Sequence, residues 1–303
     1  MTTCRTLTND TKLGLAALFL FGLSGCQSTP VDGVTKSSSV NSIFQSGTPY
    51  QKLNHFAAER GGVVFAAAGT PFSLTAVSKA ASKTPDQVDT SVLTVYIEGD
   101  GRAWITSSMP SSDPSPRSFM MAQKALEDTQ PSIYLARPCQ FQKTESPSCN
   151  MTLWTSDRFS SEVVASYSQA LDQIKRYKGV KRFHLVGYSG GAAVAMALAG
   201  QRQDIEQVVT LVGNVDPLAW IERQNLSRLG DVVNPLDYSA RLSNLPQRHY
   251  VGAKDKVVPP DMAKAFVGKI KASCADIVEM PFTHEDGWEA LSATELNRPI
   301  DCQ

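Results

Sequence analysis

A short segment around Ser189 has the residue types that a reactive hydroxyl group needs. The sequence Gly187-Tyr-Ser189-Gly-Gly191 follows an apolar stretch and precedes a run of small residues. If a strand turns this sharply into a helix, the serine adopts strained torsions, and glycine at the flanking positions avoids clashes. The turn would hold the hydroxyl above the sheet edge, with the Gly190 amide directed at a developing oxyanion. The alternative is a glycine-rich turn that only allows close packing of the helix.

A nucleophilic serine requires a base, and the chain has only four histidines. His284 lies in a loop directly after the last predicted strand, 276–280. His184 and His249 lie inside predicted strands, and His55 lies upstream of the predicted sheet. We therefore predict that His284 is the base, while a purely structural hydrogen bond from this histidine is the alternative.

The acid that would orient His284 has two candidates. Asp255 follows the predicted strand 248–252, and Asp216 follows the earlier predicted strand 208–212. We favour Asp255, and a turn-forming aspartate is the alternative reading for it. In this assignment His284 accepts the Ser189 proton, and Asp255 orients the imidazole and stabilises its protonated form.

The order Ser189, Asp255, His284 along the chain resembles that of the α/β-hydrolase family. Ala253-Lys-Asp255-Lys-Val-Val-Pro is similar to the acid loop of that family, and Pro281-Phe-Thr-His284 to its histidine loop. The resemblance implies an α/β fold with a mostly parallel central sheet, helices on both faces and a small insertion after the sixth strand. It also implies an acyl-enzyme intermediate on Ser189.

The resemblance further implies that a second oxyanion donor follows the predicted strand 92–97. The sequence there is Glu98-Gly-Asp100-Gly101-Arg, without the His-Gly pair found in many relatives. The Asp100 amide is the preferred donor beside that of Gly190, and the Gly101 amide is the next candidate. Glu98 either anchors this loop or is solvated. The Asp100 carboxylate would repel anionic substrates if it pointed into the site.

Alternation of strand and helix patterns continues from residue 92 to the end of the chain, which favours a parallel sheet covered on both faces. An upstream alternating stretch, 72–77, is predicted to form an edge strand. Predicted strands span 92–97, 132–136, 183–186, 208–212, 248–252 and 276–280. Predicted helices span 119–128, 160–177, 190–200, 261–270 and 288–296.

Two further parts of the chain, the segment 214–245 and Arg137, are expected to lie beside the predicted site. The irregular segment 214–245 contains scattered apolar residues, such as Trp220 and Leu229, that either form a partial lid or simply pack the insertion. Arg137 leaves the strand 132–136 at the same sheet edge. We expect Arg137 to pair with an acidic neighbour rather than to contact a substrate.

The first residues are typical of an export signal. Arg5 and Lys12 precede an apolar run, 13–23, which is too short to span a membrane as a helix. Leu-Ser-Gly-Cys26 follows and resembles a bacterial lipobox, with an ordinary signal peptide as the alternative. This predicts a signal over 1–25, a lipidated Cys26 and a flexible tether over 26–48, before a hydrolase domain over 49–303. Gln27 favours the outer membrane over inner-membrane retention.

Four cysteines remain for an exported chain after Cys4 and Cys26 are set aside. An even number suggests disulfides, and the local pairings Cys139–Cys149 and Cys274–Cys302 are favoured over buried free thiols. Metal binding is disfavoured, because no pair has the C-x-x-C spacing and no histidine is near them.

Composition limits the possible functions. The chain has 303 residues, 42% hydrophobic and 19% charged, with 29 basic and 29 acidic side chains. This is ordinary globular composition, and no basic surplus favours nucleic-acid binding. We find no cofactor motif and expect a monomer that acts on a small or lipid-like acyl substrate. The favoured function is hydrolysis of an ester or related acyl bond; the alternatives are an acyltransferase and a non-catalytic binding lipoprotein.

Overall fold

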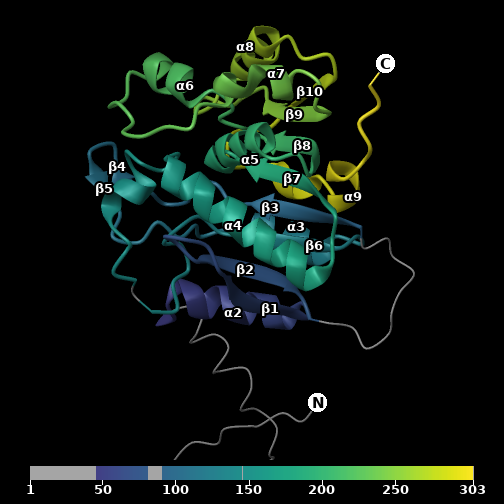
Figure 1. Cartoon of the computed structure of the whole chain (residues 1–303). Helices are drawn as coiled ribbons and strands as arrows, with labels where there is room; N and C mark the ends of the chain where they lie inside the picture. Colours follow the sequence, from purple (N-terminus) through teal and green to yellow (C-terminus); the bar gives the residue numbers. More distant parts are fainter. Residues whose placement is uncertain (1–45, 81–90, 145, 303) are drawn as a thin grey trace, which may run out of the picture. The chain divides into compact units, whose positions relative to one another are not determined.

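A computed structural model describes residues 46–80, 91–144 and 146–302. At its centre is an eight-stranded sheet with the spatial order β1-β2-β6-β3-β7-β8-β9-β10 (Figure 1). Neighbouring strands from β6 to β10 are parallel, whereas β1 and β2 pair antiparallel. The strands are β1 Gly62–Ala67, β2 Leu74–Lys79, β3 Val92–Ile97, β6 Ser132–Leu135, β7 Arg182–Tyr188, β8 Ile205–Leu211, β9 Gln247–Gly252 and β10 Ala275–Met280. The predicted mostly parallel α/β sheet is confirmed.

Helices cover both faces of this sheet. One face carries α4 Ser161–Lys178, α5 Gly190–Gln201 and α8 Asp261–Ile270, and the other carries α2 Pro49–Glu59, α3 Met120–Glu127 and α9 Ala293–Leu296. Alternating side chains of the central strands enter the two layers. In β3, for example, Val95 and Ile97 pack on the α4 and α5 side, whereas Tyr96 packs on the other. Burial on both faces explains why β3 is apolar or β-branched along its length.

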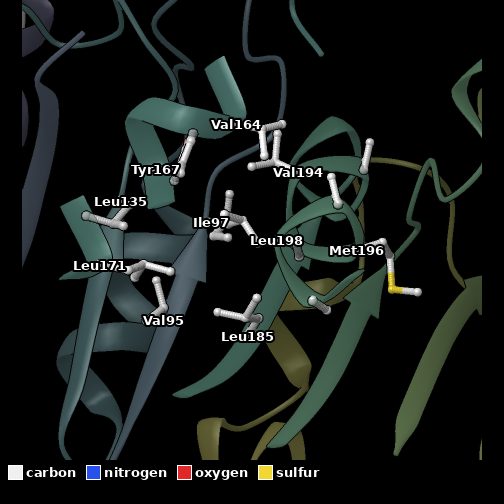
Figure 2. Close-up of a cluster of buried hydrophobic side chains, with 14 of the residues drawn as sticks. Val95, Ile97, Leu135, Val164, Tyr167, Leu171, Leu185, Val194, Met196 and Leu198 are labelled. Carbon is white, nitrogen blue, oxygen red and sulfur yellow. The ribbon is translucent and has the colours of Figure 1, made fainter. Parts of the chain in front are cut away.

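The α4 and α5 layer is closely packed over the strands. Figure 2 shows Leu171 of α4 beside Val95 of β3, and Leu198 of α5 near Leu185 of β7. Helix α4 is amphipathic, begins after the N-cap Ser160 and ends at Gly179, which has a positive φ of 71°. Helix α5 is buried along its length up to Gly200, so only small and apolar residues suit it. The turn between β7 and α5 therefore leads directly into a closely packed layer.

Two predictions about elements are wrong. The stretch 72–77 does not form an edge strand, because β1 pairs antiparallel along β2 and takes the edge. The predicted closing helix 288–296 is two short pieces, the 3₁₀ helix η3 Trp288–Ala290 and α9. Leu291 adopts an extended conformation between them, and Ser292 caps the second piece through the Glu295 amide, so the chain restarts instead of continuing as one helix.

Several elements were not predicted, among them β1, the helix α2 and a small hairpin. Helix α2 begins at Pro49 after Thr48, whose side chain forms a capping box with Gln51. A small hairpin, β4 Trp104–Thr106 and β5 Met109–Pro110, follows β3 and lies apart from the main sheet. The segment 26–48 lies almost wholly outside the described residues, and the signal 1–25 and Cys26 lie outside them entirely.

The segment 214–245 follows β8, the sixth strand of the large sheet along the chain. It contains α6 Pro217–Arg223, the 3₁₀ helix η2 Pro235–Tyr238 and α7 Ser239–Leu242. Trp220 donates a hydrogen bond of 2.7 Å to the Val257 carbonyl, so α6 is fastened to the loop after β9. None of the helices in the described part of the chain is both long and apolar enough to cross a membrane.

Both predicted disulfides are present. Cys139 bonds to Cys149, with 5.6 Å between their Cα atoms, and Cys274 bonds to Cys302, with 5.0 Å between theirs. The first closes a loop after β6, and the second ties the C-terminal segment to the residue that precedes β10. The remaining 3₁₀ helix, η1 Met151–Trp154, follows the first disulfide.

Candidate active site

Ser189 lies at the turn from β7 into α5 in a strained conformation. Its φ is 49° and its ψ is −119°, a combination that residues with a side chain rarely adopt. The backbone fixes the turn, because the Ser189 amide donates to the Leu211 carbonyl and the Ser189 carbonyl accepts from Ala192 and Asn214. The predicted strand-to-helix turn is therefore present and anchored to β8.

The glycines around Ser189 are required by close backbone approach. A Cβ atom on Gly187 would lie 2.6 Å from the Cα of Ala192. A Cβ on Gly191 would lie 2.6 Å from the carbonyl oxygen of Ile97, at the end of β3. A Cβ on Gly190 would overlap the carboxylate of Asp100. These contacts explain the Gly-x-Ser-Gly-Gly sequence by sterics rather than by flexibility.

A continuous hydrogen-bonded chain runs from Ser189 through His284 to Asp255. The Ser189 Oγ lies 2.9 Å from His284 Nε2, and His284 Nδ1 lies 2.8 Å from Asp255 Oδ2. The structure therefore brings together the three residues that the sequence singled out. The Asp255 side chain is fully buried, and that of His284 is 13% exposed.

Asp255 is held so that one oxygen remains for His284. Its Oδ1 accepts hydrogen bonds from the backbone amides of Val257 and Val258, at 2.8 and 2.9 Å. Oδ2 then faces His284, and the aspartate closes the turn that follows β9. The turn-forming role and the role as partner of histidine are thus performed by different oxygens of the same side chain.

Asp216 has other partners. Its Oδ1 accepts from the Ala219 amide at the start of α6, and its Oδ2 pairs with Lys269 of α8 at 2.7 Å. Between the two acid candidates left open by the sequence, the geometry places Asp255 at the histidine and gives Asp216 a capping role. Asp286, three residues beyond Thr283, bonds to that side chain.

Tyr188 was not identified from the sequence, although it precedes Ser189 directly. Its hydroxyl donates to the His284 carbonyl at 3.0 Å, and its ring centroid lies 6.0 Å from that of His284. Trp288 supports the same loop by donating from Nε1 to the Thr283 carbonyl. The histidine loop is therefore held from both sides. Tyr188 occupies the variable position between Gly187 and Ser189, so the motif did not indicate a role for this residue.

The loop after β3 lies against Ser189. A Cβ on Gly99 would lie 3.3 Å from the Cβ of Ser189, and the Asp100 carboxylate borders Gly190. Gly190 is the first residue of α5, where amides have no acceptor within the helix. The Asp100 amide likewise donates no hydrogen bond within the described part of the chain. Amides of both segments therefore flank the serine, as an oxyanion-binding site requires.

Side chains from neighbouring loops lock this segment. Glu98 accepts hydrogen bonds from the Gly99 amide and from the Tyr134 hydroxyl, so it anchors the loop. Gln140, fully buried, donates to the Gly99 carbonyl at 3.0 Å. Gly101 has a positive φ of 62°, and a Cβ there would lie 2.7 Å from Nε2 of Gln140. Burial raises the pKa of Glu98 to about 7.

The Asp100 carboxylate is neutralised by two buried arginines. Arg137 Nη1 lies 2.9 Å from Oδ1, and Arg158 Nε lies 3.1 Å from Oδ2. Arg137 also donates to the Arg158 carbonyl, and both guanidinium groups lie over the Phe159 ring. Arg137 therefore pairs with an acidic neighbour, as predicted. Burial lowers the pKa of Arg158, and the Asp100 charge opposes that shift.

A cavity of about 560 Å³ opens beside Ser189 and His284. Its apolar lining includes Trp104, Met120 and Tyr188, and its lining also contains charged side chains besides those of Glu98 and Asp100. Arg102 and Arg117 contribute positive charge, and Glu285, Asp286 and Glu289 contribute negative charge. No lining residue comes from 214–245, whose residues 216–223 instead line a separate cavity with α8. This arrangement supports the packing role for that segment.

Within the part of the chain that the structure describes, no group of three or more histidine, cysteine, aspartate or glutamate side chains is arranged to hold a metal ion. The cysteines 139, 149, 274 and 302 are all bonded in disulfides.

Sequence comparison places the chain in a family. Residues 121–285, just over half of the chain, match the family model described as Serine hydrolase (FSH1). The chain therefore belongs to this serine hydrolase family, and the matched region contains Ser189, Asp255 and His284. No curated protein sequence matches the chain.

Solved structures with the α/β-hydrolase fold are similar to this chain at low identity. A putative dienelactone hydrolase from Klebsiella pneumoniae subsp. pneumoniae matches at 14% identity and TM-score 0.51, covering 77% of this chain and 91% of that one. Est1E from Butyrivibrio proteoclasticus matches at 14% identity and TM-score 0.53, covering 77% and 95%. The esterase Pf2001 of Pyrococcus furiosus matches at 11% identity and TM-score 0.53, covering 76% and 86%. At such identities the likeness shows the fold alone.

Proposed function

We propose that this serine hydrolase cleaves carboxylic esters or related acyl bonds, with Ser189 as nucleophile, His284 as base and Asp255 as the acid that orients the base. The observation that carries the proposal is the hydrogen-bonded chain from Ser189 Oγ to His284 Nε2 and from His284 Nδ1 to Asp255 Oδ2, at 2.9 and 2.8 Å. Both distances lie within the reach that proton transfer and orientation require.

In the first half of the reaction Ser189 Oγ attacks the acyl carbon while its proton passes to His284 Nε2. The carbonyl electron pair moves to oxygen, and the amides of Gly190 and of Asp100 or Gly101 stabilise the resulting charge. When the tetrahedral intermediate collapses, the bond to the leaving alcohol breaks and His284 returns its proton to that alcohol. An acyl ester of Ser189 remains.

In the second half a water molecule takes the place of the alcohol. His284 accepts a proton from the water, whose oxygen bonds to the acyl carbon. On collapse the bond between the acyl carbon and Ser189 Oγ breaks, His284 returns its proton to Oγ, and the carboxylic acid is released. Asp255 keeps its negative charge throughout and stabilises the imidazolium. The partly exposed His284 and the cavity beside it would admit water, which supports hydrolysis over transfer to another acceptor.

Steady-state hydrolysis of p-nitrophenyl acetate and butyrate by the purified chain tests the proposal. We expect turnover that is lost in Ser189→Ala and His284→Ala. Ser118→Ala is the matched control, because Ser118 lines the same cavity but bonds to the Met120 amide rather than to a histidine. Turnover that survives in Ser189→Ala, or a folded wild-type protein without turnover, would contradict the proposal. The second outcome would favour a binding lipoprotein.

We also propose that the chain is exported and anchored to a membrane, facing the periplasm or cell surface, by a lipid on Cys26. The lipobox-like sequence Leu-Ser-Gly-Cys26 after an apolar run supports this location. Metabolic labelling with palmitate should mark the wild-type chain and not Cys26→Ser. Equal labelling of both, or of neither, would overturn the proposed anchor without affecting the hydrolase assignment.

A further inference from the structure

The charges that line the active-site cavity come from three segments of the chain, two of which contribute arginines and one of which contributes a group of carboxylates. Arg102 and Arg117 come from the segments that follow β3 and precede α3, whereas Glu285, Asp286 and Glu289 come from the segment after β10. The other two carboxylates that line the cavity already have partners in the protein. Glu98 accepts hydrogen bonds from an amide and a hydroxyl, and Asp100 pairs with two buried arginines. The positive and negative parts of the cavity thus belong to different loops.

Arg102 and Arg117 differ from the arginines beneath them. Arg137 and Arg158 are buried and paired with Asp100, whereas Arg102 and Arg117 are exposed and form no ion pair with any described residue. Their guanidinium groups therefore keep their hydrogen-bond donors available to a molecule in the cavity. A guanidinium can donate two parallel hydrogen bonds to a carboxylate, which makes arginine well suited to recognise that group.

Arg102 and Arg117 line the same cavity as Ser189, and a backbone hydrogen bond connects their two segments. The Arg102 amide donates to the Pro114 carbonyl at 2.9 Å, which ties the loop after β3 to the segment that contains Arg117. Arg102 follows the Gly99–Gly101 turn that borders Ser189, and both arginines also line a neighbouring cavity of about 480 Å³. An extended substrate with its acyl carbon at Ser189 could therefore place a charged end between them.

We propose that the preferred substrates are esters with an anionic group, of the carboxylate type, that binds Arg102 and Arg117 while the acyl carbon lies at Ser189. The inference rests on the proposed ester hydrolysis and names its substrate class. The negative segment that contains Glu285 and Glu289 repels the same group, so the cavity accepts the substrate in one orientation only. Trp104 and Met120 supply apolar contact for the remainder of the substrate.

Matched esters test the proposal on either side of the scissile bond. On the acyl side, mono-p-nitrophenyl succinate is compared with p-nitrophenyl butyrate, which has a methyl group in place of the carboxylate. On the alcohol side, 4-acetoxybenzoate is compared with phenyl acetate. We expect that, in one of these two pairs, the kcat/KM of the carboxylate ester at low salt is about tenfold higher than that of the neutral ester. A difference of this size corresponds to one charge-assisted contact. Added salt should reduce this preference.

Variants distinguish a specific contact from a general charge effect. Arg102→Gln and Arg117→Gln should each lower kcat/KM for the favoured carboxylate ester about tenfold and leave the neutral ester within about twofold. Arg176→Gln is the matched control, since Arg176 is an exposed arginine on α4 that lines none of the described cavities. It should change neither rate.

The outcomes separate this inference from the proposed function. Neutral esters hydrolysed as fast as both carboxylate esters, or arginine variants that slow both kinds equally, would overturn the anionic substrate class and leave the hydrolase intact. No turnover of any ester by folded protein would overturn the proposed ester hydrolysis itself.

Discussion

Asp100 Oδ1 lies 2.9 Å from Nη1 of Arg137, and the same carboxylate borders Gly190 at the start of α5. Asp100 thereby connects the loop after β3 to the turn that presents Ser189. Because Arg137 and Arg158 are both buried, they lose their compensating charge if this carboxylate is removed. The pairing therefore matters for the fold and for the segment that we propose binds the oxyanion.

Asp100→Ala should lower the free energy of unfolding by about 3 kcal/mol, because it leaves buried guanidinium groups without a counter-charge. Urea-induced unfolding measures the effect. Glu279→Ala is the control, because the Glu279 pair with Lys264 is about half exposed and is expected to contribute less than about 1 kcal/mol. Equal midpoints for the two variants would show that the buried pairing does not stabilise the loop.

The two candidate acids should respond differently to the same substitution. Asp255→Asn should lower kcat by about 10³–10⁴-fold, because an amide can no longer orient and stabilise the His284 imidazolium. Asp216→Asn should leave kcat nearly unchanged and remove only the ion pair with Lys269, since asparagine can still cap α6. Steady-state ester hydrolysis checks both, and the reverse ranking would assign the acid role to Asp216.

Glu98 should make stability depend on pH. Its pKa is raised to about 7 by burial, so between about pH 4.5 and 7 the folded state binds a proton that the unfolded state has lost. Stability from this group is therefore present at low pH and is lost as the pH rises through about 7. Relative to wild type, Glu98→Gln should gain about 3 kcal/mol between those pH values. Urea unfolding at several pH values measures this, and a constant difference would contradict it.

His249 should make stability depend on pH in the opposite direction to Glu98. Burial lowers its pKa to about 4, and it bonds to Thr210 and Gln247 within the sheet. The unfolded chain therefore binds a proton between about pH 6.5 and 4 that the folded state does not, and stability falls as the pH falls through this window. In wild type the two effects partly cancel. Acidification from pH 6.5 to 4.5 should consequently destabilise Glu98→Gln more steeply than wild type in the same titration.

Removing either disulfide should destabilise the protein by about 3 kcal/mol, with the larger effect for the longer loop. The separations are 10 residues for Cys139–Cys149 and 28 for Cys274–Cys302. Thermal unfolding of the paired Cys→Ala variants gives the comparison, with reduced wild type as the reference for loss of both. Unchanged transition temperatures in both paired variants would refute a stabilising role.

The sequence contained the signals for most of the fold around the site. Strands such as β3 and β9 are buried on both faces, so their apolar runs were visible, and the predicted helix 160–177 agrees closely with α4. Ser189, His284 and Asp255, which the structure brings together, could be singled out because the turn and the strand ends restrict residue type and position locally. The upstream capping signal at Thr48 and Gln51 was present, but it lies beside a polar stretch and was missed.

Other parts of the site depend on contacts between distant segments. Arg158 reaches Asp100 from 58 positions further along the chain, and no local pattern marks that pairing. Whether β2 lies at the edge of the sheet depends on whether another strand pairs with its outer side. The sequence did not indicate that β1 forms this pairing. Arg102, Arg117 and Glu289 line one cavity only because three loops meet there, so the sequence alone did not indicate that their charges lie around the same site.

The central claim is that Ser189 is a nucleophile activated by His284. Labelling of the purified, folded chain with a fluorophosphonate, mapped by mass spectrometry, tests it most directly because the probe requires no knowledge of the substrate. We expect a single adduct on Ser189, absent from Ser189→Ala and strongly slowed in His284→Ala. An unlabelled Ser189 in folded wild-type protein, or labelling that proceeds equally fast without His284, would contradict the account.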